Sequence, residues 1–209
     1  MPFLIQNTHI ISVPHTKSSY NIISLLIIKK FATRTATVQT LKNHLSSIER
    51  DHNFKPDIVF IDYADIMRSS RSYDSLRHEL KLVYEELRNL AMDMNIPVWT
   101  ASQANREASN ASVVGLENMS EAYGKAMVAD VVVSLSRKPM EKATGAGRLF
   151  VAKNRAGRDG ILFPVHLDTS MSKISIIENQ SEMSLSEVVQ SDQSDMRNLL
   201  KKKWKQVNS

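Results

Sequence analysis

The stretch DIVFIDYADIM, residues 57–67, restricts what this chain can fold into. Its apolar residues Ile58 to Ile61 run directly into Asp62, which is the pattern of a buried strand that ends in a carboxylate. Two further short apolar runs, IPVWTASQ from residue 96 and ADVVVSL from residue 129, have the same character. Such runs are typical of strands buried on both faces of a parallel sheet. The chain is therefore predicted to be an α/β protein.

Segments with helical spacing lie between these strands. The mostly apolar run of residues 22–31 indicates another buried strand. After it, Thr35 or Thr37 can cap a helix. A longer helix is expected over residues 73–94, with Asn95 as its stop. The apolar residues that recur at helical spacing are Val38, Leu41, Leu45 and Ile48 in the first helix and Leu76, Leu80, Leu87, Leu90 and Met94 in the second. This alternation predicts a mostly parallel sheet flanked by helices.

The pattern changes in the last third of the chain to strands joined by turns. The run GRLFVAKNRAGRDGILFPVHLD indicates two strands with a glycine-containing connection, and KISIIE adds a third. We therefore expect an antiparallel β extension at one edge of the sheet. The chain divides into an irregular segment 1–21, a core 22–178, and a tail 179–209 that is first an acidic linker and then basic.

Composition excludes several classes of protein. The chain has no Cys, which excludes disulfide scaffolds and Cys-based zinc sites. No apolar run is long enough to span a membrane, and the N-terminus has neither an early positive charge nor a small-residue cleavage site. We therefore expect no membrane association and a cytoplasmic location. Lys and Arg outnumber Asp and Glu by 27 to 22, a balance that permits nucleic-acid binding without requiring it.

Two of the predicted strands end in polar side chains that could bind a ligand or take part in catalysis. Asp62 stands where open α/β sheets bind ligands, and a carboxylate there can hold Mg²⁺ beside nucleotide phosphates. Asp65 is a weaker second candidate for the same role. Gln103 follows the strand at 97–101, and its amide can orient water or sense a phosphate. A turn-capping aspartate and a loop glutamine are the ordinary alternatives, but the two strand ends together are more specific than either one.

A basic cluster lies in the segment AKNRAGRDG. Lys153 and Arg155 alternate along a predicted strand and so face the same side, with Arg158 in the connection that follows. Such a pair can neutralise charge that develops on a transferred phosphoryl group. The alternative is a solvated edge strand that is protected by its charge.

The order of these motifs resembles one family, the RecA-like core of hexameric replicative DNA helicases of the DnaB type, especially its phage T4-like branch. Four segments carry the resemblance, in the family's order and over about residues 22–178. They are DIVFIDYADIM, YEELRNLAMDMNIPVWTASQANR, GKAMVADVVVSLSR and RLFVAKNRAGRDG. No single segment is specific, but the ordered set is, above all SQANR followed by AKNRAGRDG.

The resemblance implies roles for four residues in the use of ATP and Mg²⁺. Asp62 matches the Walker B position that serves magnesium, and Gln103 matches the sensor of the γ-phosphate. Lys153 and Arg155 match residues that reach the nucleotide of the neighbouring subunit. An active site between the subunits of a homo-hexamer, and contacts with primase or other replisome proteins, follow from the same resemblance.

The resemblance also implies contacts with single-stranded DNA in the centre of a ring. The polar segments 68–74 and 104–122 match the loops that face that channel. A motor that moves along a strand needs contacts to the backbone that tolerate any sequence. The candidate phosphate contacts are Arg68, Arg71, Arg106 and Lys125.

The departure from the family is the phosphate-binding loop. The motif G-x-x-x-x-G-K-[ST] does not occur in the sequence, and neither AYGKAM nor PHTKSS supplies its glycines and hydroxyl. Glycines allow backbone N–H groups to converge on a phosphate without obstruction by Cβ atoms. We therefore expect a partial helicase core whose P-loop lies outside this chain and which is inactive by itself.

Two other functions are also compatible with the sequence. One is another RecA-fold ATPase, such as a recombinase or a KaiC-like protein, against which the basic pair Lys153 and Arg155 favours the helicase. The other belongs to a different class, a non-catalytic module that binds single-stranded DNA or supports oligomerisation. The missing P-loop favours that second alternative for the isolated polypeptide.

Overall fold

The computed structural model describes residues 8–14, 23–105, 111, 113–118 and 123–177. Three helices and eight strands are formed in this part of the chain. In chain order they are β1 (Thr8–Pro14), β2 (Ile23–Lys29), α1 (Val38–His52), β3 (Val59–Ile61), α2 (Leu76–Met94), β4 (Val98–Thr100), α3 (Tyr123–Val128), β5 (Val131–Ser136), β6 (Ala146–Asn154), β7 (Ile161–Asp168) and β8 (Lys173–Ile176). Single 3₁₀ turns occupy Ala64–Ile66, Leu116–Asn118 and Pro139–Lys142.

The two longer helices begin and end where local side-chain chemistry places them. Thr37 caps α1, since its side chain accepts from the backbone N–H of Thr40 and the Thr40 side chain accepts from the N–H of Thr37. The helix ends at Asn53, and α2 ends at Asn95, both in the left-handed conformation that Asn adopts more readily than most residues. Of the two predicted caps, Thr35 and Thr37, it is Thr37 that caps the helix, and the prediction of Asn95 as a stop is confirmed.

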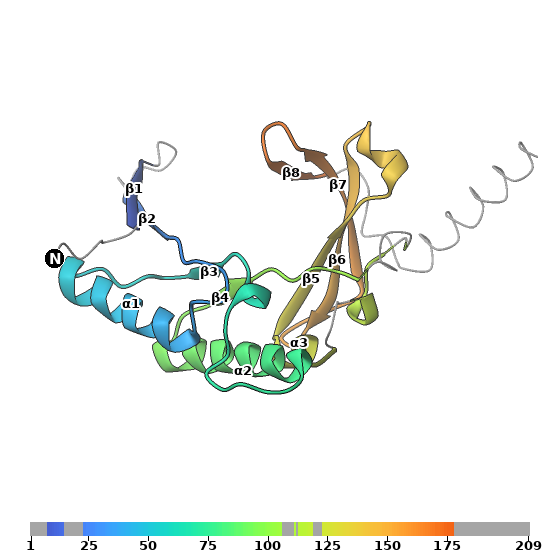
Figure 1. Cartoon of the computed structure of the whole chain (residues 1–209). Helices are drawn as coiled ribbons and strands as arrows, with labels where there is room; N and C mark the ends of the chain where they lie inside the picture. The colour runs from blue at the N-terminus through green and yellow to red at the C-terminus, as the bar shows by residue number, and fades with distance from the viewer. Residues whose placement is uncertain (1–7, 15–22, 106–110, 112, 119–122, 178–209) are drawn as a thin grey trace, which may run out of the picture.

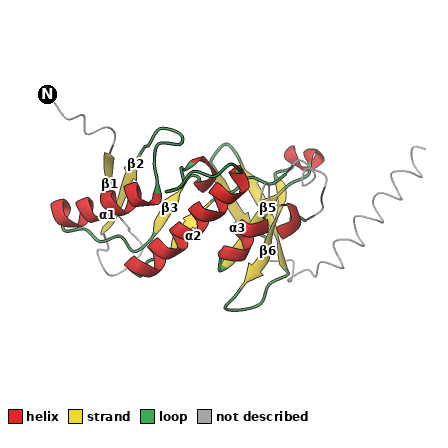
Figure 2. Cartoon of the chain, turned by 60° about the horizontal axis from the view of Figure 1, so that its bottom comes forward, coloured by secondary structure: helices red, strands yellow, loops and turns green. Residues whose placement is uncertain are grey.

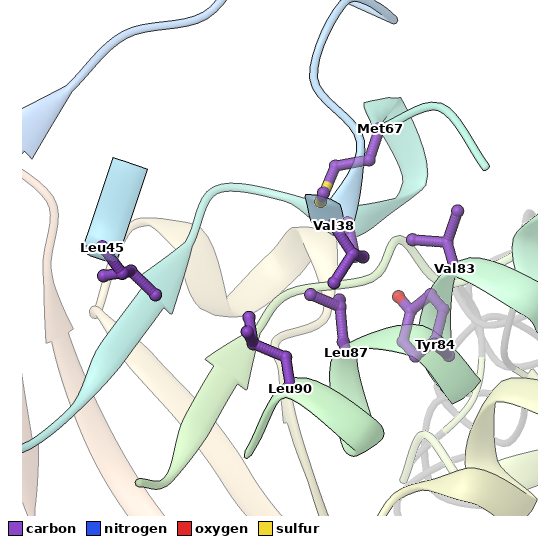
Figure 3. Packing of buried hydrophobic residues seen from close by; sticks show 8 residues of the cluster. Val38, Leu45, Met67, Val83, Tyr84, Leu87 and Leu90 are labelled. Atoms are coloured by element: carbon purple, nitrogen blue, oxygen red, sulfur yellow. The ribbon is translucent and has the colours of Figure 1, made fainter. Parts of the chain in front are cut away.

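The main core lies between α1, α2 and the parallel strand pair (Figure 3). Val83, Leu87 and Leu90 recur at helical spacing along α2 and point toward Val38 and Leu45 of α1. Met67 and Ala64, which follow β3, close the cluster, and Val59, Ile61 and Val98 pack against it from the strands. The expected apolar stripes of both helices are thus a core.

Three small sheets make up the β structure. β3 and β4 pair in parallel, with Val59 beside Val98 and Ile61 beside Thr100. β5, β6, β7 and β8 form an antiparallel sheet in that order, and β1 pairs antiparallel with β2. The α/β class with an antiparallel C-terminal extension is confirmed. Within the described residues, however, parallel pairing is confined to β3 and β4, because β2 bonds to β1 and β5 bonds to β6.

All three helices lie on the same side of the strands, as Figures 1 and 2 show from two directions. On the other side, apolar side chains are exposed: Phe60 of β3 is 71% exposed and Trp99 of β4 is 50% exposed. β5 continues the pattern, since alternate residues Val131, Val133 and Leu135 are exposed. No element of the described chain covers these side chains, so the strands predicted to be buried are covered on one face only. We call these five residues the uncovered apolar side.

The N-terminal segment 1–21, predicted to be irregular, contains a strand. Residues 8–14 form β1, and backbone pairing with β2 accounts for a strand that the side-chain pattern did not indicate. The predicted tail 179–209 lies outside the described residues. Among the described helices, none has the length and apolar character needed to cross a membrane.

Candidate nucleotide site

The ends of β3 and β4 are fastened together by polar contacts. The hydroxyl of Thr100 donates to the carbonyl of Ile61 at 3.1 Å and accepts from the N–H of Ala64 at 2.9 Å. The amide of Gln103 donates to the hydroxyl of Tyr63 at 3.2 Å. Asp62 and Gln103 therefore extend from neighbouring ends of the only parallel strand pair in the described residues.

The surroundings of Asp62 suit a carboxylate that contacts a hydrated cation. Its side chain is exposed and has no hydrogen bond or ion pair within the part of the chain that the structure describes. That part also contains no cluster of three or more His, Cys, Asp or Glu that could hold a metal by itself. Mg²⁺ beside nucleotide phosphates needs only one or two carboxylates, because phosphate oxygens and water supply its other ligands. A single free carboxylate at a strand end fits that requirement.

Asp65 has a different role from the one predicted as a second magnesium ligand. Its Oδ1 accepts from the Tyr84 hydroxyl at 2.8 Å and from Lys125 Nζ at 2.8 Å, and its Oδ2 accepts from the Ser102 hydroxyl at 3.0 Å. Both carboxylate oxygens are therefore engaged within the chain. Burial and the adjacent Asp65 carboxylate raise the pKa of Tyr84, which keeps the phenol protonated and able to donate.

The prediction of Lys125 as a DNA phosphate contact is wrong in this structure. Lys125 lies in α3 with a relative exposure of 1%, and its ammonium pairs with Asp65 while it lies 5.6 Å from the centre of the Tyr84 ring. A cation this deeply buried cannot reach a nucleic acid without breaking that pair. Gly124 and Lys125 also lie within α3, so this Gly-Lys pair forms no phosphate-binding loop.

Lys153 and Arg155 both bond to the C-terminal carbonyls of α3. Lys153 Nζ donates to the carbonyl oxygens of Ala126 and Met127 at 2.8 and 3.2 Å, and Arg155 Nη2 donates to that of Met127 at 2.7 Å. Arg155 also pairs with Asp130 at 3.2 Å. Both cations therefore contact the same helix end, as expected of a pair on one side, but Arg155 lies in the turn one residue beyond β6 and not in the strand.

A β-bulge directs Lys153 to this side. Val133 pairs with Val151 but Val132 pairs with Lys153, so Ala152 is an extra residue in β6. In a regular ladder Ala152 would pair with Val132, and Lys153 would share a face with Val131, which belongs to the uncovered apolar side. Loss of hydration, followed by the charge of Arg155, lowers the pKa of Lys153.

The remaining candidate cations are less constrained. Arg68 and Arg71 are exposed in the segment between β3 and α2, which also contains the exposed Tyr73. Arg106 lies outside the described residues. The backbone carbonyl of Arg158 accepts from the Asn154 side chain at 3.3 Å in the β6–β7 connection.

Sequence reasoning missed the residues that hold the site together. Tyr63, Tyr84, Ser102 and Asp130 each contact a predicted site residue or its neighbour. The position of Ser102 directly before Gln103 and of Tyr63 directly after Asp62 was a usable signal, because residues that flank a strand end share its surroundings. No local pattern marks Tyr84 or Asp130.

Similar proteins were found by both sequence and structure. A family model described as DnaB-like helicase C terminal domain matches residues 7–202, a wider range than the predicted core 22–178. The DnaB-like replicative helicase of Enterobacteria phage T4 is 31% identical over 117 residues, which are 53% of this chain and 24% of that protein. The chain thus spans about a quarter of the length of such relatives.

Two solved structures share the fold. The first, an ATPase domain, aligns with a TM-score of 0.60 and 19% identity over 68% of this chain and 51% of that one. The second, a DnaB-like replicative helicase studied with primase, aligns with a TM-score of 0.56 and 19% identity over 64% of this chain and 33% of that one. These likenesses confirm the RecA-like fold, and the family match covers most of the sequence. The chain belongs to the DnaB-like helicase C terminal domain family.

Proposed function

We propose that this chain is part of the motor of an ATP-dependent replicative DNA helicase that unwinds DNA during replication. The observation that carries the proposal is the placement of Asp62 and Gln103 at the adjoining ends of β3 and β4 in a chain of this family. Carboxyl ends of parallel strands are where open α/β sheets bind ligands. The P-loop motif, which this sequence does not contain, comes from outside these residues.

In this proposal Asp62 serves the Mg²⁺ ion of the bound nucleotide, and Gln103 serves its γ-phosphate. Asp62 holds Mg²⁺ through its free carboxylate, directly or through water, and Mg²⁺ offsets the charge of the phosphate oxygens of ATP. Gln103 senses the γ-phosphate with its amide, which Tyr63 holds in position from the neighbouring strand end. Lys153 and Arg155 leave the carbonyls of α3 to contact the nucleotide of an adjacent subunit, where their charges stabilise the transferred phosphoryl group.

Single-stranded DNA is the proposed track of this motor. Arg68 and Arg71 supply phosphate contacts from the exposed segment after β3. Tyr73, 43% exposed in the same segment, adds an aromatic face on which a base can stack. Arg106 keeps its predicted role as a contact. A homo-hexamer in the cytoplasm, with primase as a partner, completes the proposal; the structural neighbour that was studied with primase supports that choice of partner.

The test is a chimera in which this chain replaces the matching part of the T4 DnaB-like replicative helicase, which brings the remaining length of the protein. We expect ATP hydrolysis that single-stranded DNA stimulates, and an Asp62→Asn change that lowers the hydrolysis rate by about 100-fold through loss of the charge that serves Mg²⁺. Gln103→Ala should reduce the stimulation by DNA more than the basal rate.

Asp57→Asn is the matched control, because Asp57 is exposed and lies just before the opposite end of β3. It should leave hydrolysis unchanged. A chimera that hydrolyses ATP equally well with Asp62 and with Asn at that position would contradict the proposal. Lys153 and Arg155 are proposed to promote hydrolysis of the nucleotide bound by the adjacent subunit. An unchanged rate of ATP hydrolysis in the chimera after Lys153→Ala and Arg155→Ala would contradict that role.

A non-catalytic role for the isolated chain is the second candidate. It is favoured by the lack of a P-loop motif in a sequence that retains exposed Arg68 and Arg71. In that case the chain alone binds single-stranded DNA with strong salt dependence and turns over no ATP. Turnover by the chain alone that Asp62→Ala abolishes would exclude it. A recombinase or KaiC-like ATPase is separated from the helicase by DNA unwinding in the chimera.

A further inference from the structure

The short helix α3 contacts both groups of predicted site residues. Its residue Lys125 contacts the first group, with Nζ 2.8 Å from Asp65 Oδ1 and 3.4 Å from Ser102 Oγ. Asp65 is in the 3₁₀ turn that follows Asp62, and Ser102 directly precedes Gln103. The buried ammonium therefore joins α3 to the ends of β3 and β4.

The last carbonyls of the same helix hold the basic pair. Ala126 and Met127 accept from Lys153 and Arg155, while Val128 accepts from Arg88 of α2. Arg88 also pairs with Asp130 at 3.0 Å, the residue that Arg155 contacts. Cations are favoured at a helix C-terminus, where carbonyls without intrahelical partners carry partial negative charge.

We propose that Lys125 and Asp65 are positioning residues, which make α3 a mechanical link between the β3–β4 strand ends and the pair Lys153 and Arg155. A displacement of the strand ends then moves α3, and the sites that hold Lys153 and Arg155 move with it. The inference rests on the proposed function only for the roles of the residues at the two ends of the link.

The two sets of contacts differ in how easily they break. Lys125 is 1% exposed, so separation from Asp65 would leave its buried charge without an ion-pair partner in a medium of low dielectric. Lys153 is half-buried and Arg155 is exposed, and water can replace the carbonyls to which they donate. The link is therefore fixed to the strand ends and releasable at the basic pair. That asymmetry is what a relay to an adjacent subunit requires.

The test measures how fast Lys153 is acetylated by an activated acetate ester, read by mass spectrometry on the whole chain without nucleotide or DNA. We expect Lys125→Met to raise the acetylation rate of Lys153 about tenfold, since one charged contact that fixes α3 is lost. Hydrogen exchange of the α3 amides should rise in parallel. Asp65→Asn, which keeps an oxygen acceptor at the same place, should give a smaller rise.

The matched control is Leu90→Ala, which removes a buried side chain of the main core and none of the polar contacts of α3. It lowers global stability but leaves the Lys125–Asp65 pair in place, so Lys153 should react as in the parent chain under conditions where every variant stays folded. Lys42→Met controls for loss of a lysine charge, because Lys42 forms an exposed ion pair with Asp93.

Equal reactivity of Lys153 in Lys125→Met and Leu90→Ala would overturn the inference. If Lys125→Met does not fold, Asp65→Asn decides in the same assay. Failure of the chimera to hydrolyse ATP would contradict the proposed function alone, because acetylation of Lys153 requires no hydrolysis.

Discussion

Asp62 and Asp65 are three residues apart, yet their carboxylates have different surroundings. Asp62 is exposed and unpaired within the described residues, whereas Asp65 accepts from Tyr84, Ser102 and Lys125. A carboxylate that accepts several hydrogen bonds and one ion pair is held in place and is costly to remove. At the scale of residues, one of these two aspartates is therefore suited to a ligand and the other to the structure around it.

His44 gives a prediction about pH at the same scale. The imidazole lies edge-on to Phe31 with ring centres 6.2 Å apart, and its Nε2 is buried without a hydrogen-bond partner within the described residues. Burial, and then the charge of Lys29, lower the pKa of His44 below the ordinary 6.5. Between those two pKa values the unfolded chain binds a proton that the folded chain does not, so stability falls as the pH drops through this window.

We therefore expect the parent chain to lose more unfolding free energy than His44→Leu when the pH falls from about 7.5 to about 5.5. Urea denaturation of both proteins at each pH measures this difference. His78→Leu, on an exposed position of α2, is the control and should follow the parent. Identical pH dependence in the parent and His44→Leu would contradict the pKa shift.

At the scale of elements, the two longer helices α1 and α2 were predictable, whereas the short helix α3 and the strand pairing were not. Thr37 and Asn95 mark helix ends because capping depends on a few neighbouring residues. The partner of β5 depends on residues far along the chain, and the bulge at Ala152 leaves no mark in the sequence pattern. Lys125 was assigned to DNA for the same reason, since its burial requires α2, α3 and two strand ends to meet.

The end of α2 provides the test at this scale. Asn95 has φ of 52°, a conformation that costs most non-glycine residues about 1 kcal/mol or more. Asn95→Ala should lower the free energy of unfolding by about 1 kcal/mol, whereas Asn95→Gly should keep or raise it slightly. Urea denaturation measures both changes. Asn89→Ala, exposed within the same helix, should be neutral or mildly stabilising; a loss equal to that of Asn95→Ala would remove the conformational explanation.

At the scale of the whole molecule, the helices lie on one side of the strands (Figures 1 and 2), and the strands leave apolar side chains exposed. Phe60, Trp99 and alternate residues of β5 form the uncovered apolar side, and monomeric proteins rarely leave such a surface open to water. The solved ATPase domain that shares this fold matches the chain over 51% of its own length, so that domain contains further elements. An α/β sheet normally has helices on both faces, and these strands have helices on one face only, which accounts for the exposed apolar side chains.

The isolated chain should therefore bind the dye ANS and self-associate. Phe60→Gln should lower both ANS fluorescence and light scattering while the free energy of unfolding changes by less than about 0.5 kcal/mol, because the ring is 71% exposed. Leu87→Ala, at a buried position of the core, should instead cost about 2–5 kcal/mol. A large loss of stability in Phe60→Gln would show that the ring is covered in solution.

The bulge in β6 has a consequence for how the chain tolerates insertions and deletions. Loss of Ala152 would leave a regular ladder in which Val151 still pairs with Val133 and Lys153 with Val132, so both side chains would keep their faces. A residue gained at the same place could not be absorbed by restoring a regular ladder, because the ladder already accommodates one extra residue there. In evolution, this part of β6 should therefore tolerate the loss of one residue more readily than the gain of one.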